Sequence, residues 1–143
     1  MSRSFEQMID DVIRREHMRA VEIYRREYYE APGIDLLPVR VRLFVFDAAI
    51  HHGPGRAICL VQEVCNAAGF GPLAVDGHCG PLTLRAAATA DRVMGDWLLA
   101  ALVEERRNFY LALVERHPEQ RVFLKGWLCR LAEFDRHADS RAA

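Results

Sequence analysis

The chain has 143 residues, the usual size of one domain, and 51% of them are hydrophobic, which is enough for a single buried core. Nineteen Lys and Arg residues against twenty Asp and Glu residues give a formal net charge of -1, so the basic surplus of a nucleic-acid-binding protein is missing. No stretch approaches the roughly 20 apolar residues that span a bilayer, and we expect no membrane span.

The N-terminal segment predicts a long amphipathic helix. Ser4 and Gln7 have the spacing of a capping box, and apolar residues follow at helical spacing until Ala31, Pro32 and Gly33 stop the pattern. Residues 4–30 therefore form one long helix or two joined helices. The apolar residues alternate with charged ones, so we expect no signal peptide. The protein is then made in the cytoplasm, and action in the periplasm or a virion would require a separate export route.

The segment from Pro38 to His52 fits two patterns. Residues 39–43 alternate like a strand, whereas Val39, Leu43, Phe46 and Ile50 have helical spacing. Its length and its apolar residues on nearly every side favour a buried helix. A second helix follows Gly53-Pro54-Gly55, and the glycine-rich residues 69–81 are expected to form an ordered turn region.

Three further helices are predicted in the remaining chain. One begins at Pro81 and ends near Ala90, and a longer one, capped by Asp96, runs to Arg116. The last covers about residues 119–134, where Gly126 suggests the close approach of a neighbouring helix. Residues 137–143 are expected to be a frayed tail. The sequence thus predicts an all-α protein, a single compact domain of about six helices.

Cys59, Cys65, Cys79 and Cys129 are scattered, without the spacing of a zinc site or a disulfide framework. We expect them to be buried, reduced thiols. The adjacent pairs His51-His52 and His78-Cys79 lack a spaced second pair, so we predict no metal and no cofactor.

Three blocks of sequence carry a family resemblance. They are FDAAIHHGPGRAICLVQEV (46–64), VDGHCGPLTLRA (75–86) and ERRNFYLALVERHPEQRVFLKGWLCRL (105–131). In this order they resemble the C-terminal peptidoglycan-associated half of glycoside hydrolase family 108, with its F-D-x-A, L-Q, D-G-x-x-G-P-x-T, R-x-x-F-Y and F-x-x-G-W-x-x-R patterns. The resemblance implies peptidoglycan as the partner. Each block also has a structural interpretation: a tight turn at Asp76-Gly77, a Thr83 hydroxyl near free backbone groups, and helix packing at Gly126-Trp127.

The same resemblance implies a lysozyme-like muramidase, which cleaves the β-1,4 bond between N-acetylmuramic acid and N-acetylglucosamine. The family's catalytic glutamate follows an Arg or His in an R/H-E-G-G-Y motif, so Glu16, after Arg15, would inherit the general-acid role. His17-Met18 replaces the glycines, and the small β/loop lobe that shapes the family's cleft is missing. Another departure is His51, where the family usually has Asn.

The resemblance also divides the chain and suggests substrate contacts. Residues 1–33 would be an N-terminal helical segment carrying Glu16, residues 34–136 the peptidoglycan-associated region of the same compact domain, and residues 137–143 the tail. The candidate substrate-binding residues are Asp47, His51, Asp76, Gly77 and Trp127.

Glycosidic hydrolysis needs a proton donor and usually a second group that activates water or stabilises the transition state. Glu16 shares the helical phase of the apolar residues Phe5, Ile9, Val12 and Ala20. Such a position would partly desolvate its carboxyl group, as a proton donor requires. Alternatively, Glu16 lies at the edge of this apolar stripe and pairs with an arginine. No second carboxylate is convincingly placed. Asp47 lies among hydrophobic residues and could instead bond a helix end or an arginine.

Three interpretations remain open. The chain is a degenerate, peptidoglycan-associated or accessory protein of a phage-like or secretion system, a minimal active muramidase, or a helical protein interaction module. Loss of the lobe would also uncover apolar surface at Met18, Tyr24 and Tyr28, which predicts a homo-oligomer or a phage or secretion protein as partner.

Overall fold

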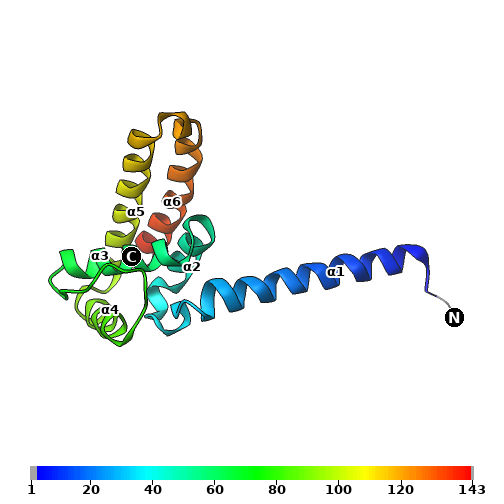
Figure 1. Cartoon of the computed structure of the whole chain (residues 1–143), viewed down its shortest axis with the longest axis horizontal. Helices are drawn as coiled ribbons and strands as arrows, with labels where there is room; N and C mark the ends of the chain where they lie inside the picture. The colour runs from blue at the N-terminus through cyan, green and yellow to red at the C-terminus, as the bar shows by residue number, and fades with distance from the viewer. Residues whose placement is uncertain (1–2, 143) are drawn as a thin grey trace.

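The computed structural model describes the backbone of residues 3–142 and the side chains of residues 3–135. All regular structure in this part of the chain is helical, which confirms the predicted all-α class with about six helices. The helices, drawn in Figure 1, are α1 Phe5–Tyr24, α2 Val39–His52, α3 Pro54–Ala67, α4 Pro81–Met94, α5 Asp96–Arg116 and α6 Arg121–Ala142.

The first helix forms an arm. Ser4 caps it through the predicted capping box, in which the Ser4 hydroxyl accepts from the Gln7 amide and the Gln7 side chain accepts from the Ser4 amide. The helix continues without a break into a π-helical segment, Arg25–Glu30, and then stops at residues 31–33 as predicted. No residue of α1 is buried, and Figure 1 shows the helix projecting from the packed body formed by α2 to α6.

The segment 39–52 is a helix, as its length and composition predicted. Val41, Phe44 and Val45 are buried, but Val39 and Leu43 are 75% and 69% exposed. The predicted helix is confirmed, but it is buried on one side only. The packed helices cover one side of α2 and leave an apolar stripe on the other.

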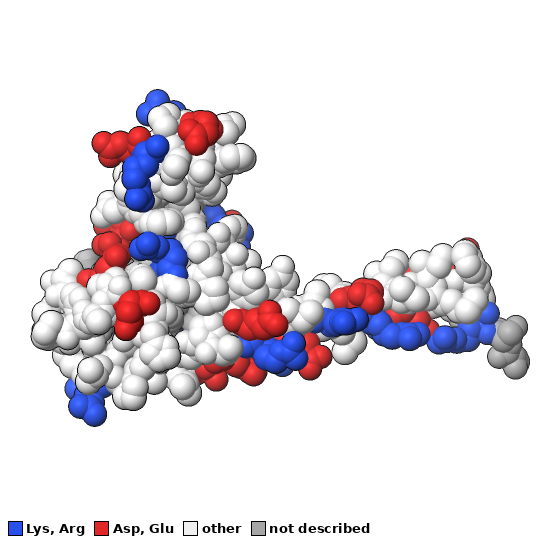
Figure 2. Space-filling view, in the orientation of Figure 1, with Lys and Arg blue, Asp and Glu red and all other residues white. Residues whose placement is uncertain are grey.

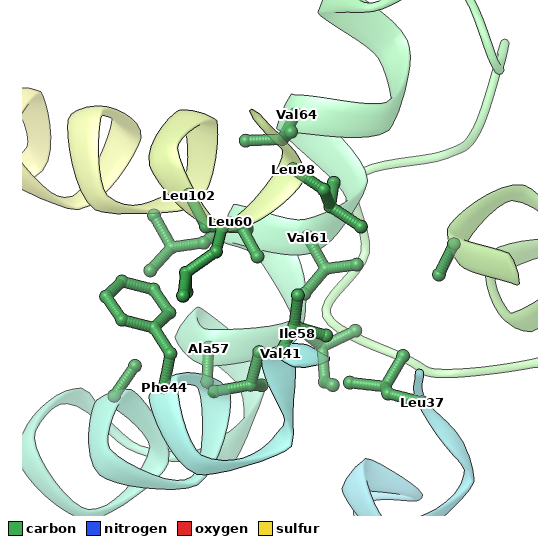
Figure 3. Close-up of a cluster of buried hydrophobic side chains, with 14 of the residues drawn as sticks. Leu37, Val41, Phe44, Ala57, Ile58, Leu60, Val61, Val64, Leu98 and Leu102 are labelled. Atoms are coloured by element: carbon green, nitrogen blue, oxygen red, sulfur yellow. The ribbon is translucent and has the colours of Figure 1, made fainter. Parts of the chain in front are cut away.

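The core of the body lies between α2, α3 and α5 (Figure 3). Gly53, with a φ of +90°, separates α2 from α3, and a proline opens each of α3 and α4. Buried alanines of α4 present a small surface to this core, and α6 contributes Leu131. The labelled core side chains in Figure 3 are Leu37, Val41, Phe44, Ala57, Ile58, Leu60, Val61, Val64, Leu98 and Leu102.

Several local expectations differ from the structure. Gly95, rather than Asp96, precedes α5, and the Asp96 carboxylate forms an ion pair with Arg40 of α2. Helix α6 extends through residues 137–142, which were predicted to be a tail. Gly126 is exposed, and a Cβ there would meet no atom within 4 Å, so the predicted close approach of a helix at this position is wrong.

The thiols differ in exposure. All four are free; Cys65 is buried, Cys59 and Cys79 are half-buried, and Cys129 is exposed, contrary to the prediction that all are buried. Burial raises the pKa of Cys65 to about 11. Between residues 3 and 142, no helix is both long enough and apolar enough to cross a membrane.

Candidate functional site

The proposed proton donor lies in the arm, outside the packed body. Glu16 is exposed, as are its neighbours His17 and Met18, so the partial desolvation expected from the apolar stripe is absent in this structure. The alternative, an ion pair with an arginine, is also not found, because none of the ion pairs between described residues includes Glu16. The helix therefore presents this carboxylate to solvent.

Asp47 instead lies at the centre of a buried ionic cluster. Arg106 of α5 donates from Nη1 to Asp47 Oδ2 at 2.8 Å, and Arg130 of α6 donates from Nε to Oδ1 at 2.8 Å. The Asp47 side chain is 8% exposed and the Arg106 side chain 0%, whereas Arg130 reaches the surface at 47%. Burial alone would raise the pKa of Asp47, but the hydrogen bonds from Arg130 and Arg106 outweigh it and lower that pKa. The cluster joins α2, α5 and α6.

Aromatic rings enclose this cluster. The guanidinium of Arg106 lies 5.3 Å from the centre of the Phe44 ring and 5.5 Å from that of Tyr110, so its charge is also stabilised by the ring faces. Tyr110 stacks on Trp127, with ring centres 4.9 Å apart, and Trp127 stacks in turn on Phe123 at 5.9 Å. Phe123 is 57% exposed, so this aromatic row leads from the cluster to the surface.

His52 completes the cluster as a neutral acceptor. Arg106 Nε donates to His52 Nε2 at 3.2 Å, which requires that nitrogen to carry no proton. Burial first, and then the charge of Arg106, lower the pKa of His52 to about 4. The preceding residue, His51, is more exposed to solvent. The partial burial of its ring and the charges of Arg130 and Arg106 still lower its pKa, although Asp47 has the opposite effect.

A second polar network holds the predicted turn. Gln62 Nε2 donates to Asp76 Oδ1 at 3.0 Å and to Thr83 Oγ1 at 3.1 Å, while Gln62 Oε1 accepts from the Gly77 amide at 3.0 Å. Asp76 Oδ1 also accepts from the His78 amide at 2.9 Å. The hydrogen bonds from the His78 amide and Gln62 lower the pKa of Asp76. Thr83 was expected to bond backbone groups, but its hydroxyl accepts from a side chain instead.

Gly77 is required at this turn for two reasons. Its φ is +75°, and a Cβ at this position would lie 2.8 Å from the backbone oxygen of Gly55. The loop before α4 therefore lies directly against the start of α3. This confirms the structural interpretation of the Asp76-Gly77 motif.

The structure groups the sequence-predicted site residues unevenly. Asp47, His51 and Trp127 lie on or around the ionic cluster, Asp76 and Gly77 belong to the Gln62 network, and Glu16 belongs to neither. Both oxygens of Asp47 already accept from arginines, so this carboxylate is not free to activate water. Sugar contact by these residues stays a prediction.

The sequence patterns did not assign roles to Arg106, Arg130, His52 or Gln62. Three of them nevertheless stand in the family patterns: Arg106 opens R-x-x-F-Y, Arg130 closes G-W-x-x-R, and Gln62 is the Q of L-Q. In the structure, hydrogen bonds at Asp47 join residues from three of the patterns, and hydrogen bonds at Gln62 join residues from two. Their positions in these patterns were the available signal.

The fold and its two networks define a helical domain. The polar residues of the family patterns form hydrogen bonds that link its helices and the turn before α4. The family model described as a predicted peptidoglycan domain matches residues 56–132, more than half of the chain, and the chain belongs to this family. The model of glycosyl hydrolase 108 matches residues 2–53. Together the two matches confirm the resemblance to a peptidoglycan-associated, muramidase-like family.

A solved structure is similar over most of the chain. The structure of Brucella abortus SagA superposes with a TM-score of 0.69 at 28% sequence identity, covering 86% of this chain and 63% of that chain. The present chain thus spans less than two thirds of that structure's length. No curated protein matches the chain.

Proposed function

We propose that this protein is a muramidase-derived, peptidoglycan-associated domain that does not hydrolyse glycan strands by itself. The observation that carries the proposal is the position of Glu16, exposed on a projecting helix that has no buried residue. Glycosidases place two carboxyl groups about 5 to 9.5 Å apart across the scissile bond. Asp47, the other candidate carboxylate, is engaged by two arginines within the body.

A lone exposed glutamate would be a weak catalyst. General acid catalysis contributes typically about 10² to 10⁴-fold, well below the acceleration that a glycosidase needs. The remainder comes from a cleft that positions the sugar and stabilises the transition state. A solvent-exposed position on a single helix supplies neither of these effects.

We place peptidoglycan association on the surface beside the ionic cluster, which we call the α2/α6 surface and define by His51, Phe123, Trp127 and Arg130. Exposed aromatic rings suit the apolar faces of sugars. The exposed part of Arg130 suits the carboxylates of peptidoglycan stem peptides. In a phage-like or secretion system such a domain would be an accessory that anchors a complex to the cell wall, delivered to the periplasm or virion by a separate route.

Co-sedimentation with purified sacculi tests this proposal. We expect the protein to pellet with sacculi, and we expect the paired substitution His51→Ala with Phe123→Ala to reduce the bound fraction several-fold. Trp97→Ala is the matched control, because Trp97 is 76% exposed but lies at the opposite end of α5 from the α5–α6 connection. Absence of sedimentation by the folded wild type would instead favour a helical interaction module, with a protein as its only partner.

The runner-up function is a minimal active muramidase whose site is completed by another subunit. The retained Glu16 favours it, since the Arg-Glu portion of the family motif is intact. Release of soluble muropeptides that is abolished by Glu16→Gln would support this alternative over a purely associating domain.

A further inference from the structure

The arm carries an apolar stripe that nothing in the monomer covers. Large apolar side chains lie on one side of α1 at helical spacing over residues 5–13 and again at Ile23 and Tyr24, and they are between 36% and 73% exposed. Between these two groups, Glu16 and Ala20 occupy the same side of the helix. In Figure 2 the charged side chains of the outer arm gather along one side, and uncharged residues form the other. We call this the α1 stripe; its members are Phe5, Met8, Ile9, Val12, Ile13, Ile23 and Tyr24.

The stripe does not end with the arm. Tyr24 at its inner end lines a groove of about 610 Å³, together with Tyr29 and the α2 residues Leu43, Phe46 and Ile50. Leu43 is 69% exposed and Ile50 41%. The apolar surface therefore continues from the arm onto the body, and contiguous exposed apolar surface is typical of interaction sites.

The charges of the arm are divided between its two halves. Residues 5–13 contain three carboxylates and no Lys or Arg, whereas residues 14–26 contain five arginines and two glutamates. The halves thus have net charges of -3 and +3, with His neutral. A second arm in antiparallel orientation would place each acidic half against a basic half, and a parallel arm would place like charges together.

We propose that two copies of this chain form a homodimer through antiparallel pairing of their α1 stripes. The 20-residue helix is about 30 Å long, so fully overlapped arms would bring Phe5 of each copy close to Tyr24 and the groove of the other. The same patch is used twice, as a two-fold symmetric interface requires. The proposal does not depend on peptidoglycan association.

This pairing gives Glu16 a structural role. The stripe runs from Phe5 to Tyr24, so the two-fold axis would cross between residues 14 and 15, one to two residues from Glu16. Glu16 also shares the stripe's helical phase, so both copies would bring this carboxylate into the seam. A polar residue in such a seam weakens pairing but fixes its register. Glu16 would then be a register-setting residue of the dimer.

An anionic membrane is the other surface that an amphipathic helix could meet. The acidic outer half of the arm disfavours it, because the apolar residues that would insert there are flanked by Glu6, Asp10 and Asp11 and by no Lys or Arg within residues 5–13. The balanced charge of residues 5–26 fits its own antiparallel copy better.

Light scattering and sedimentation velocity over a range of concentrations test the dimer. We expect a dimer for the wild type and a monomer for the double variant Ile9→Asp with Ile13→Asp. Met18→Asp is the matched control: Met18 is 64% exposed on the opposite side of α1, so this variant should remain a dimer. Circular dichroism of each variant checks folding, since none of these side chains belongs to the core of the body.

Two measurements address orientation and register. In a Cys129→Ser background, a mixture of Phe5→Cys and Tyr24→Cys chains should form an oxidised heterodimer, and neither variant alone should cross-link. Glu16→Leu should tighten dimerisation by about tenfold or more, whereas Glu22→Leu, outside the stripe, should leave it unchanged. A wild-type monomer at the highest soluble concentration, or vesicles of phosphatidylglycerol binding the monomer through the stripe, would overturn the proposal.

Discussion

Asp47 is the residue on which the ionic cluster depends. Replacing it by Asn would leave the fully buried Arg106 without a compensating charge, and breaking a buried pair in this way costs about 3 to 5 kcal/mol. We therefore expect the free energy of unfolding, measured in urea, to fall by about 3 kcal/mol in Asp47→Asn.

The matched control for that substitution is Asp135→Asn. Asp135 also joins α6 to α5, through Arg107 at 3.2 Å, but both side chains of that pair are about a third exposed or more. Its loss should cost less than about 1 kcal/mol. Equal effects of the two substitutions would show that Asp47 does not stabilise the packing of α2 against α5 and α6.

His52 gives the folded protein a specific dependence on pH. Its pKa is about 4 in the folded state against an ordinary 6.5, so the unfolded chain takes up the proton first as the pH falls. The contribution is present above pH 6.5 and is lost between pH 6.5 and 4. With a discount for partial exposure, the loss is on the order of 2 kcal/mol.

Urea unfolding at pH 7 and pH 4.5 should reveal this difference. His52→Gln keeps an acceptor for Arg106 but cannot take up a proton, so its unfolding free energy should change less between the two pH values than that of the wild type. The stability that comes from the lowered pKa of Asp47 is lost only below the ordinary aspartate pKa of about 3.9, outside this window. The same pH dependence in both proteins would contradict the assignment of a neutral, half-buried His52.

Individual residues show what the sequence could predict of the site. The hydrophobic neighbours of Asp47 correctly indicated a buried structural aspartate that could bond an arginine, but its partners lie 59 and 83 residues further along the chain. Periodicity reports which side of a helix is apolar and not which distant arginine will meet it. Hence Arg106 and Arg130 were recognisable only as members of the family patterns.

At the level of elements, the turn before α4 depends on the fit between Gly77 and Gly55. Gly77→Ala would strain a residue with positive φ, at about 1 to 2 kcal/mol, and would also force a Cβ against the backbone oxygen of Gly55. Gly69 has a comparable φ of +88°, but a Cβ there would meet no atom within 4 Å. Thermal unfolding should therefore show a clearly larger loss of stability for Gly77→Ala than for Gly69→Ala, and equal losses would argue against the close contact.

The helices themselves were largely predictable because their signals are local. The capping box at Ser4, the prolines that open α3 and α4, and the stop at residues 31–33 all lie within one or two turns of the boundaries that they set. The faces of the helices were less predictable. The exposed stripe of α2 and the open surroundings of Gly126 depend on which neighbours are present, and apolar periodicity alone cannot distinguish a core from an uncovered surface.

At the scale of the whole molecule, the projecting arm is the feature on which the proposed function rests. The apolar phase of α1 predicted the helix, and loss of the family's lobe predicted uncovered apolar surface; Met18 and Tyr24 are indeed 64% and 45% exposed, while Tyr28 is half-buried. The exposed position of Glu16 was not predicted. The body leaves this helix unpacked, so in this structure the carboxylate lacks the desolvated cleft that a proton donor needs.

We propose that this domain associates with peptidoglycan without cleaving it. The most direct test is the rate at which the purified chain generates new reducing ends from sacculi. The rate is measured beside a complete family-108 enzyme and beside Glu16→Gln. We expect the protein to bind sacculi but to release reducing ends at least about a thousandfold more slowly than the complete enzyme, with no difference between wild type and Glu16→Gln. A wild-type rate within about tenfold of the complete enzyme, abolished by Glu16→Gln, would contradict this expectation and establish an active muramidase.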